Sequence, residues 1–305
     1  MISKEEFFTI VIPTFNRFNE LVISLPQFLK LVSNNSEIIV IDQSNDGLPQ
    51  DNIVFLKSMC SGANVRYYLS EKPSLPLSIN TGAHLAKNDI VFILDDDLDI
   101  IDDIIIKHLP YYSDLSVSAV AGSYYAGNYS SPWVPTEISG RAKTLASAHM
   151  SARKEVLLSI GAATWLKKPF TTIDWELAES INEFGKVVVA KDCFVFHRAP
   201  SVGGCANQGF RSVEWYKNTI HNHYLWLRNR RFPLSLLKLP KHIFTIIKYN
   251  IPGLGSLISF EFWKEVIIPA VRSGRNTYKK YNKIRPSEIF EDREIKLLFE
   301  TKKFD

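Results

Sequence analysis

The sequence contains few cysteines and no long apolar segment. Its three cysteines, Cys60, Cys193 and Cys205, are odd in number and lack the paired spacing of a zinc site. This pattern excludes a disulfide framework and fits a reducing compartment. A run of about 18 apolar residues, as a membrane-spanning helix requires, is also missing. The first apolar stretch is interrupted by Pro13, so we do not expect a signal peptide and we predict a cytoplasmic protein.

Acidic residues are scarce in one part of the chain. Residues 210–285 carry 15 Lys and Arg but only 3 Asp and Glu, whereas residues 1–209 carry 17 and 23. The net charge of +4 therefore combines an acidic body with a basic carboxyl-terminal third. The composition, 46% hydrophobic and 22% charged, is otherwise ordinary for a globular protein. The asymmetry predicts that the basic part contacts an anionic surface.

Apolar runs alternate with helical patterns along the first two thirds of the chain. Strands are expected at 8–12, 37–41, 64–69, 90–94, 117–123, 186–189 and 194–196. Helices are expected at 15–32, 51–60, 80–86, 101–108 and 175–184, and a long loop at 124–145. This alternation predicts an α/β fold with a mostly parallel sheet and helices on both faces. In such folds, ligands bind at the carboxyl ends of the strands.

Three consecutive carboxylates follow the expected strand 90–94. Asp95, Asp96 and Asp97 place like charges at the edge of a core, which is unfavourable unless a cation neutralises them. A divalent cation bound by oxygen ligands and shared with a substrate phosphate would do so. The alternative is an acidic turn or helix start. The strands at 8–12 and 37–41 also end in polar residues, Thr14 and Asp42, which favours the metal site.

Six segments resemble, in order and spacing, glycosyltransferase family 2, whose inverting members have the GT-A fold. The segments are residues 9–17, 37–47, 74–82, 94–97, 148–153 and 173–176. The resemblance covers residues 7–230 and implies a Rossmann-like sheet flanked by helices. Three positions depart from the family pattern: Ile79, His149 and Ile173 stand where Arg, Asn and Glu are common. These departures weaken the inference about the donor sugar more than the inference about the reaction class.

The resemblance implies a nucleotide-diphosphate sugar donor and a divalent cation, Mn²⁺ or Mg²⁺, acting as a Lewis acid. Asp97 and His197 are the implied metal ligands; the alternative for His197 is a surface or core histidine. Asp42 is expected at a nucleobase edge, and Asn80 near the donor, with turn capping and helix N-capping as the alternatives. The implied nucleotide- and donor-binding residues are Pro13, Thr14, Asn16, Arg17, Asp42, Ser44, Asn80, Asp95 and Asp96.

Inverting transfer also requires a carboxylate that removes the proton of the acceptor hydroxyl during its attack. Asp174 matches the Asp of the family's acidic motif and is the expected base. Glu176 is the reserve candidate, or a residue that orients the acceptor. Asp174 also precedes an apolar helical run, so it fits a helix cap, and the two roles are compatible.

The acceptor site is indicated by fewer residues. We expect contacts from Trp133, His149, Trp175 and Arg198. Trp133 and nearby tyrosines fit stacking on sugar faces, with loop packing as the alternative. Arg198 and the glycines at 203–204 fit a lid that closes over the diphosphate.

The basic third of the chain is mainly helical in pattern from residue 213, with apolar residues interleaved with Lys and Arg. Apolar faces flanked by basic residues are typical of helices in a membrane interface. Anionic lipid attracts each basic residue near its surface by about 1 kcal/mol. The alternative is a set of helices that pack on the catalytic domain. We therefore expect a catalytic domain at 1–212, with nucleotide-sugar and acceptor halves at 1–100 and 101–212, and a helical, membrane-associating region at 213–305.

The combined prediction is a metal-dependent inverting glycosyltransferase, of the hexosyl- or deoxyhexosyl-transferase kind. A resemblance to enzymes of bacterial surface-polysaccharide assembly implies a glycan acceptor, often lipid-linked, and peripheral attachment to the inner face of the cell membrane. No nucleic-acid motif is present. A nucleotidyltransferase of similar fold is an alternative, but residues 13–17 supply no glycine-rich phosphate loop. A non-catalytic membrane-binding protein with a degenerate transferase fold is a second alternative, but the presence of Asp97 and Asp174 argues against it.

Overall fold

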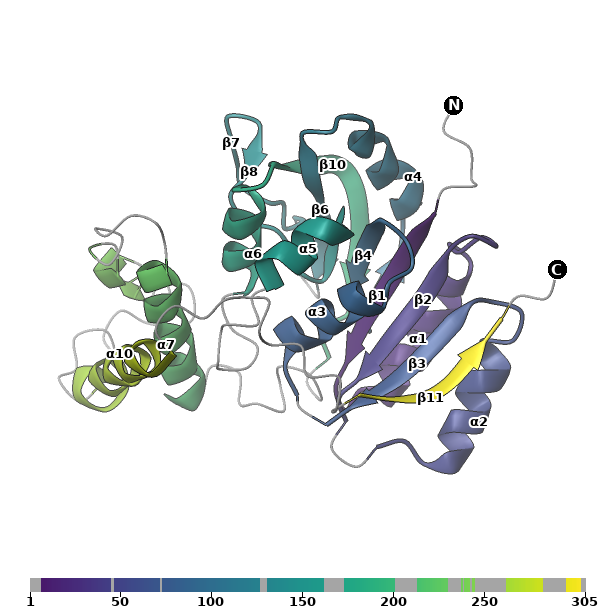
Figure 1. Ribbon diagram of the computed structural model, residues 1–305, viewed down its shortest axis with the longest axis horizontal. Coiled ribbons are helices and arrows are strands. Elements are labelled where there is room, and N and C mark those ends of the chain that lie inside the picture. Colours follow the sequence, from purple (N-terminus) through teal and green to yellow (C-terminus); the bar gives the residue numbers. More distant parts are fainter. Residues whose placement is uncertain are drawn as a thin grey trace.

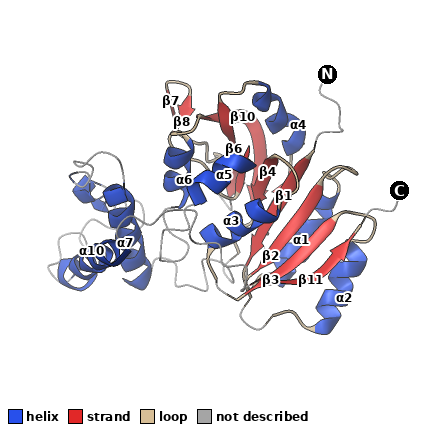
Figure 2. Cartoon of the chain, viewed as in Figure 1, coloured by secondary structure: helices blue, strands red, loops and turns tan. Residues whose placement is uncertain are grey.

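The computed structural model describes residues 7–44, 47–71, 73–126, 131–161, 173–200, 213–229, 237, 239–241, 243–244, 262–281 and 295–302. Within them, nine strands form one sheet in the order β11-β3-β2-β1-β4-β9-β6-β10-β5 (Figures 1 and 2). The strands are β1 (Phe8–Thr14), β2 (Glu37–Asp42), β3 (Val65–Ser70), β4 (Ile90–Leu94), β5 (Leu98–Ile100), β6 (Val117–Ala126), β9 (His149–Arg153), β10 (Lys186–His197) and β11 (Ile295–Thr301). A separate ribbon joins β7 (Glu137–Ile138) to β8 (Arg141–Ala142).

The amino-terminal half of the sheet is parallel. β1 lies between β2 and β4 and pairs parallel with both, and β3 continues this arrangement beside β2. β9 is antiparallel between β4 and β6, and β10 is parallel to β6. The prediction of an α/β fold with a mostly parallel sheet is confirmed. The carboxyl ends of β1, β2 and β4 therefore meet at one edge of the sheet.

Helices cover both faces of the sheet (Figure 1). The helical elements are α1 (Phe18–Leu29), α2 (Gln50–Met59), α3 (Leu75–Leu85), α4 (Ile104–His108), η1 (Leu109–Ser113), α5 (Lys154–Ile160), α6 (Ile173–Ile181), α7 (Val213–Asn229), the π-helical turn η6 (Trp263–Ile267) and α10 (Ile268–Tyr281). Side chains of α1, α2 and α4 join one buried cluster, and those of α3, α5 and α6 join another. The two clusters occupy opposite faces because neighbouring strand residues point to opposite sides.

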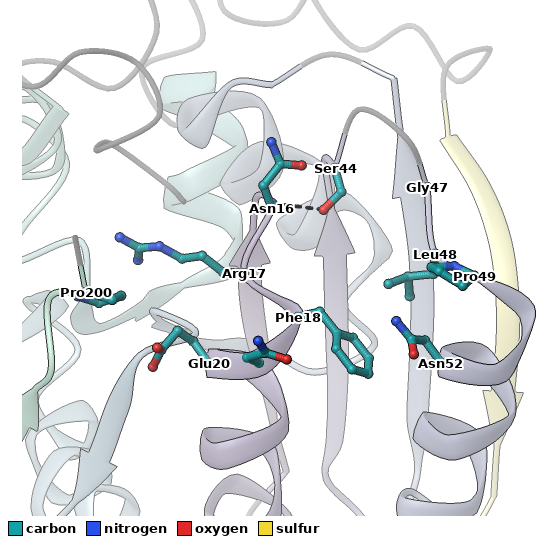
Figure 3. A pocket seen from close by; sticks show the side chains of 11 residues that line it. Asn16, Arg17, Phe18, Glu20, Ser44, Gly47, Leu48, Pro49, Asn52 and Pro200 are labelled. Atoms are coloured by element: carbon teal, nitrogen blue, oxygen red, sulfur yellow. Dashed lines mark hydrogen bonds between the residues drawn. The ribbon is translucent and has the colours of Figure 1, made fainter. Parts of the chain in front are cut away.

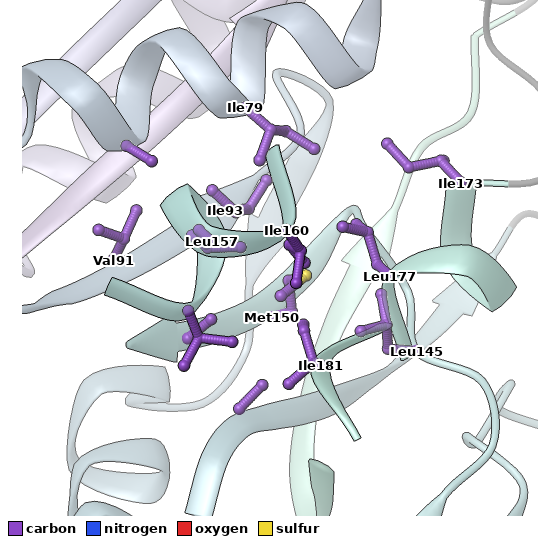
Figure 4. Close-up of a cluster of buried hydrophobic side chains, with 14 of the residues drawn as sticks. Ile79, Val91, Ile93, Leu145, Met150, Leu157, Ile160, Ile173, Leu177 and Ile181 are labelled. Atoms are coloured by element: carbon purple, nitrogen blue, oxygen red, sulfur yellow. The ribbon is translucent and has the colours of Figure 1, made fainter. Parts of the chain in front are cut away.

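Both faces of the central strands are buried, which explains why their sequences are almost continuously apolar. In β2, Ile38 and Val40 pack with α1, while Ile39 and Ile41 pack with α3. Figure 4 shows the cluster on the α3 face, where Ile79, Leu157 and Leu177 from three helices meet the strands. This packing holds the sheet edge that carries the polar residues.

Several local predictions differ from the structure. The expected strands 186–189 and 194–196 are one strand, β10, with a register shift between Val189 and Phe194. The expected loop 124–145 contains the end of β6 and the β7–β8 ribbon. β1 continues through Pro13 to Thr14, because Pro13 lies beyond Val11, the last residue of β1 that pairs with β4.

The carboxyl-terminal region contains both helices and a strand. α7, η6 and α10 share a small apolar cluster that includes Tyr216, Ile220 and Val266. Gly274 allows this approach, since a Cβ there would lie 2.9 Å from a ring carbon of Tyr224. The chain then returns to the sheet, where β11 pairs antiparallel with β3. The region 213–305, expected to be mainly helical, therefore also contains a strand at 295–301 that was not predicted. None of the described helices has the length and apolar character needed to cross a bilayer.

Candidate functional site

The acidic residues after β4 meet the end of β10 at one edge of the sheet. The Arg198 N–H donates to the Asp97 carbonyl oxygen at 3.0 Å, which places His197 beside the carboxylates. His197 Nε2 lies 3.0 Å from Asp97 Oδ1 and 4.0 Å from Asp95 Oδ2. One ligand atom from each of the three side chains lies within 4.8 Å of the others. Two carboxylates and an imidazole form a donor set that suits Mn²⁺ or Mg²⁺.

The titration behaviour of this cluster reflects crowded charge. Burial, and then the charge of Asp97, raise the pKa of Asp95 to about 6. Burial disfavours ionisation of both Asp97 and His197, but their mutual hydrogen bond and attraction outweigh it. The pKa of Asp97 is therefore lowered and that of His197 is raised. Asp95, Asp97 and His197 thus fit the divalent cation that the sequence predicts, because a positive charge there relieves the carboxylate repulsion.

Asp96 has different neighbours from the other two carboxylates. Thr14 Oγ1 donates to Asp96 Oδ2 at 2.5 Å, and an Arg17 guanidinium nitrogen lies 3.2 Å from Asp96 Oδ1. The same nitrogen lies 2.8 Å from Asp97 Oδ2. Burial and the charge of Asp97 raise the pKa of Asp96 to about 8. Asp96 therefore anchors Arg17 and the end of β1, while Arg17 acts as an internal cation for the Asp97 carboxylate.

Arg17 also lines a pocket beside the acidic cluster (Figure 3). The pocket has a volume of about 430 Å³ and lies between the start of α1 and the segment that follows β2. Asn16, in the left-handed region at φ 53°, donates its N–H to Ser44 Oγ at 2.9 Å across this pocket. The predicted residues among its lining are Asn16, Arg17 and Ser44. The sequence analysis missed the rest: Phe18, Asn19, Glu20, Gly47, Leu48, Pro49, Asn52 and Pro200.

Asp42 lies behind this pocket. Its Oδ1 accepts hydrogen bonds from the Ser44 N–H and the Ser44 hydroxyl, at 2.9 and 2.6 Å. Its Oδ2 accepts one from the Tyr67 hydroxyl at 2.8 Å. Asp42 is 1% exposed and caps the turn that follows β2, as the alternative interpretation expected, while its contact with a nucleobase edge stays a prediction. Tyr67 was missed because the pairing of β2 with β3 cannot be derived from sequence spacing alone.

Asn80 lies inside α3 and not at its start. The N-cap is Ser74, whose hydroxyl accepts from the Leu77 N–H, so the N-cap alternative for Asn80 is wrong. The Asn80 side chain is 1% exposed, and its Oδ1 has no hydrogen-bond partner within the described residues. Pro13, like Asn80, is buried, and neither residue lines the Arg17 pocket.

Asp174 and Glu176 lie in the first turn of α6, in different surroundings. Asp174 is half-buried and accepts the Ser147 N–H at 2.9 Å. Burial raises the pKa of Asp174, and the nearby charge of His197 partly opposes this increase. The charge of Asp174 in turn contributes to the raised pKa of Asp95. Glu176 is 1% exposed and accepts the Ser180 hydroxyl at 2.8 Å. The charge of Asp174 therefore acts on the acidic cluster, whereas the Glu176 carboxylate forms its hydrogen bond with Ser180 of the same helix.

An aromatic chain leads away from His197. Tyr124 packs edge-on against the His197 ring at 5.4 Å, and Trp133 stacks on Tyr124 at 5.1 Å. Two backbone hydrogen bonds between Tyr124 and Trp133 fix this stack. Trp175 instead contacts His223 of α7 at 5.4 Å. Trp133 therefore belongs to a row of packed aromatic rings that starts at His197, whereas Trp175 forms a contact between α6 and α7.

Arg198 is held by partners within the protein. It donates to Glu20 Oε2 at 2.9 Å and to Ser24 Oγ at 2.8 Å, and it also contacts Asp99. These partners belong to α1 and β5, and the expected contact of Arg198 with the acceptor or the diphosphate stays a prediction. Arg198 fastens the end of β10, where His197 meets Asp97. The glycines at 203–204 lie outside the described residues.

His149 also differs from its prediction. Its ring is fully buried, with Nδ1 3.0 Å from the Ser123 carbonyl oxygen. It stacks on His108 at a centroid distance of 5.1 Å. A side chain in this position cannot contact an acceptor, so the prediction is wrong. Its neighbours come from α4 and β6, far apart in sequence, and no local pattern could have indicated them.

Comparison with protein families places this geometry in context. Residues 9–165 match the family model described as Glycosyl transferase family 2. The chain belongs to this family. The match contains the acidic residues 95–97 and the lining of the Arg17 pocket except Pro200, whereas Asp174 and His197 lie beyond it. A comparison with curated proteins found no match.

Solved structures share the fold of this family 2 chain. GalNAc-T7 with UDP, GalNAc and Mn²⁺ has a TM-score of 0.58 at 14% identity, over 90% of this chain and 57% of that one. TarS 1–349 of S. aureus with UDP-GlcNAc scores 0.61 at 14% identity, over 89% and 81%. The mannosyltransferase PcManGT of Pyrobaculum calidifontis with GDP-Man and Mn²⁺ scores 0.53 at 12% identity, over 92% and 90%. The chain thus spans little more than half of GalNAc-T7, and these likenesses establish a GT-A-like fold.

Proposed function

We propose that the protein is a metal-dependent inverting glycosyltransferase that moves a sugar from a nucleotide-diphosphate donor to a glycan hydroxyl. The main support is the convergence of Asp95, Asp97 and His197 beside the Arg17 pocket. A divalent cation in this cluster, Mn²⁺ or Mg²⁺, would supply Lewis-acid stabilisation of the leaving diphosphate. Structural neighbours that contain nucleotide sugars or Mn²⁺ agree with this assignment.

The residues of this chain would share the remaining tasks. Arg17 lies between the pocket and the carboxylates, so its guanidinium is positioned to pair with donor phosphate oxygens. Asn16 and Ser44 would line the nucleoside part of the pocket. Asp174 would accept the proton of the acceptor hydroxyl, and its raised pKa makes it a stronger base than an exposed carboxylate. Trp133 and Tyr124 offer an aromatic surface for a sugar ring.

The test is a donor screen followed by two matched variants. Release of nucleoside diphosphate is measured with Mn²⁺ or Mg²⁺ across sugar nucleotides, with candidate glycan acceptors. Asp174→Asn keeps an oxygen that can accept the Ser147 N–H, so we expect normal folding with turnover reduced by about 10² to 10⁴. Glu176→Gln should lose far less. If Asp174→Asn retains full turnover, the base is assigned wrongly, and if no donor is consumed, the transferase proposal fails.

We further propose that α10 contacts an anionic membrane surface, as a lipid-linked acceptor in surface-polysaccharide assembly would require. Ile268, Arg272 and Arg275 are exposed and follow one another at helical spacing, and Trp263 and Lys264 are exposed just before them. An apolar and basic surface of this kind suits a membrane interface.

Liposome co-sedimentation tests this second proposal. Wild-type protein should bind vesicles of anionic lipid and lose this binding at high salt. The double variant Arg272→Glu/Arg275→Glu should not bind. Lys30→Glu/Lys57→Glu makes the same charge change at two exposed positions, one directly after α1 and one on α2, and is the control. Equal binding by the two double variants would show that net charge, and not α10, is responsible.

A further inference from the structure

A second group of potential metal ligands is buried inside the protein. It consists of His108 from α4, His149 from β9 and Cys193 from β10, each with 0% of its surface exposed. One ring nitrogen of each histidine and Cys193 Sγ lie within 4.8 Å of one another. Cys193 Sγ is 3.7 Å from His149 Nε2. Three segments, each about forty residues from the next along the chain, thus supply one ligand atom each to the same place.

The hydrogen bonds of the two imidazoles leave their second nitrogens available. The Ser123 carbonyl oxygen can only accept, so His149 Nδ1 carries the hydrogen and Nε2 has a lone pair near Cys193. His108 Nδ1 lies 2.9 Å from the Ser151 hydroxyl. Its Nε2 is buried and has no hydrogen-bond partner within the part of the chain that the structure describes. Histidines that bind metals are typically held in this way, with the other ring nitrogen donating to a carbonyl or hydroxyl group.

The packing of the core holds one of the two rings in place. Gly122 makes room for His149, since a Cβ at residue 122 would lie 2.3 Å from Nδ1. The histidine is thus fixed by packing as well as by its hydrogen bond to Ser123.

We propose that His108, His149 and Cys193 bind one thiophilic cation with a filled d shell, Cu⁺ or Zn²⁺. A thiolate with two neutral imidazoles suits both ions. Binding replaces the thiol proton of Cys193, which is released to the solvent. With Cu⁺ the resulting site is neutral, whereas Zn²⁺ leaves one positive charge in a fully buried place. Because an uncompensated buried charge is unfavourable, Cu⁺ is the favoured occupant. This site is independent of the sugar-transfer chemistry.

Metal retention by the full-length chain tests the proposal. Protein treated with a chelator is incubated with Zn²⁺, or with Cu⁺ without oxygen, desalted, and analysed for bound metal and for thiolate-to-metal absorption in the ultraviolet. We expect wild type to retain about one ion per chain with that absorption. Asp97→Asn should retain the same amount, because it alters only the acidic cluster. Cys193→Ala should retain less than about a tenth.

Cys60→Ala is the matched control, because Cys60 is also a buried cysteine of the same apolar cluster, but it lies at the end of α2 and is not part of the His108, His149 and Cys193 group. It should retain the ion like wild type. Circular dichroism checks folding, and if Cys193→Ala does not fold, His108→Phe, which keeps a ring of similar size, replaces it. The proposal is overturned if wild type retains neither ion, if Cys193→Ala retains as much as wild type, or if only Asp97→Asn loses the ion.

Discussion

Replacing Arg17 by methionine should tighten the binding of Mn²⁺. In the structure, the Arg17 guanidinium contacts Asp97 Oδ2 at 2.8 Å and Asp96 Oδ1 at 3.2 Å. The Arg17 side chain is 12% exposed and that of Asp97 is fully buried, so solvent screens this pair only weakly. A cation that binds Asp97 must compete with this internal charge. Methionine keeps much of the length of the side chain but removes the competition.

The size of the effect follows from the ion pairs. With an effective dielectric constant of about 20, a pair at 2.8 Å gains about 6 kcal/mol before desolvation is counted. Removing one partner of a buried pair costs about 3–5 kcal/mol of stability. If Mn²⁺ recovers about half of that loss, its affinity rises by roughly 10- to 100-fold. The metal-free variant should therefore unfold more easily than wild type, and Mn²⁺ should restore more of its stability.

Titration calorimetry with Mn²⁺, and thermal unfolding with and without Mn²⁺, measure both quantities. Arg153→Met is the control, because the Arg153 guanidinium donates to the carbonyl oxygens of Val117 and Tyr112 and not to the acidic cluster. It should lose stability without a change in Mn²⁺ affinity. Binding of nucleoside diphosphate at saturating Mn²⁺ should weaken in Arg17→Met only. If Arg17→Met binds Mn²⁺ as wild type does, or more weakly, Arg17 does not compete with the cation.

Three further predictions concern the surroundings of the site. The pKa of His149 lies near 4 instead of 6.5, so the unfolded chain takes up a proton at His149 before the folded chain does as the pH falls. In the presence of chelator, the unfolding free energy of wild type relative to that of His149→Phe should therefore drop by about 3 kcal/mol between pH 6.5 and 4. A difference between the two proteins that stays constant with pH in urea titrations would contradict this. Gly122→Ala should lower the free energy of unfolding by roughly 2 kcal/mol or more, because the added Cβ would overlap the His149 ring. Gly140→Ala, at φ 70° with no atom near the added Cβ, should lower it by only about 1 kcal/mol. Arg198→Met should weaken Mn²⁺ binding by roughly 3- to 10-fold, since His197 loses its support from α1; unchanged affinity in calorimetry would exclude that supporting role.

Sequence patterns predicted most of the architecture because the relevant interactions are local or periodic. β1, β2 and β4 are buried on both faces, so they are continuously apolar, and they end at polar residues where the sheet meets solvent. The prediction failed for β11, whose short apolar run follows a basic helical region and pairs with β3 more than 220 residues away. Such pairing depends on which sheet edge is open and has no signal in the strand itself.

The candidate site was predicted less completely than the fold. Asp95, Asp97 and His197 were indicated as residues with suitable chemistry, and the structure brings them together. The internal hydrogen bonds of Asp42, His149 and Arg198 were not predicted, because each side chain is held by a partner distant in sequence. Tyr67, Ser123 and Glu20 are these partners, and they are identifiable only once the strands and helices are packed.

The sequence by itself determined the α/β class, the edge of the sheet that carries the candidate site, and the supply of carboxylates there, because strand periodicity and charge are properties of short segments. Only the tertiary structure decided which partners each of the three aspartates has. Asp97 faces His197, Asp95 lies at the same cluster, and Asp96 is occupied by Thr14 and Arg17. The same packing placed His108, His149 and Cys193 together, since three-dimensional neighbours are set by how layers pack and not by spacing along the chain.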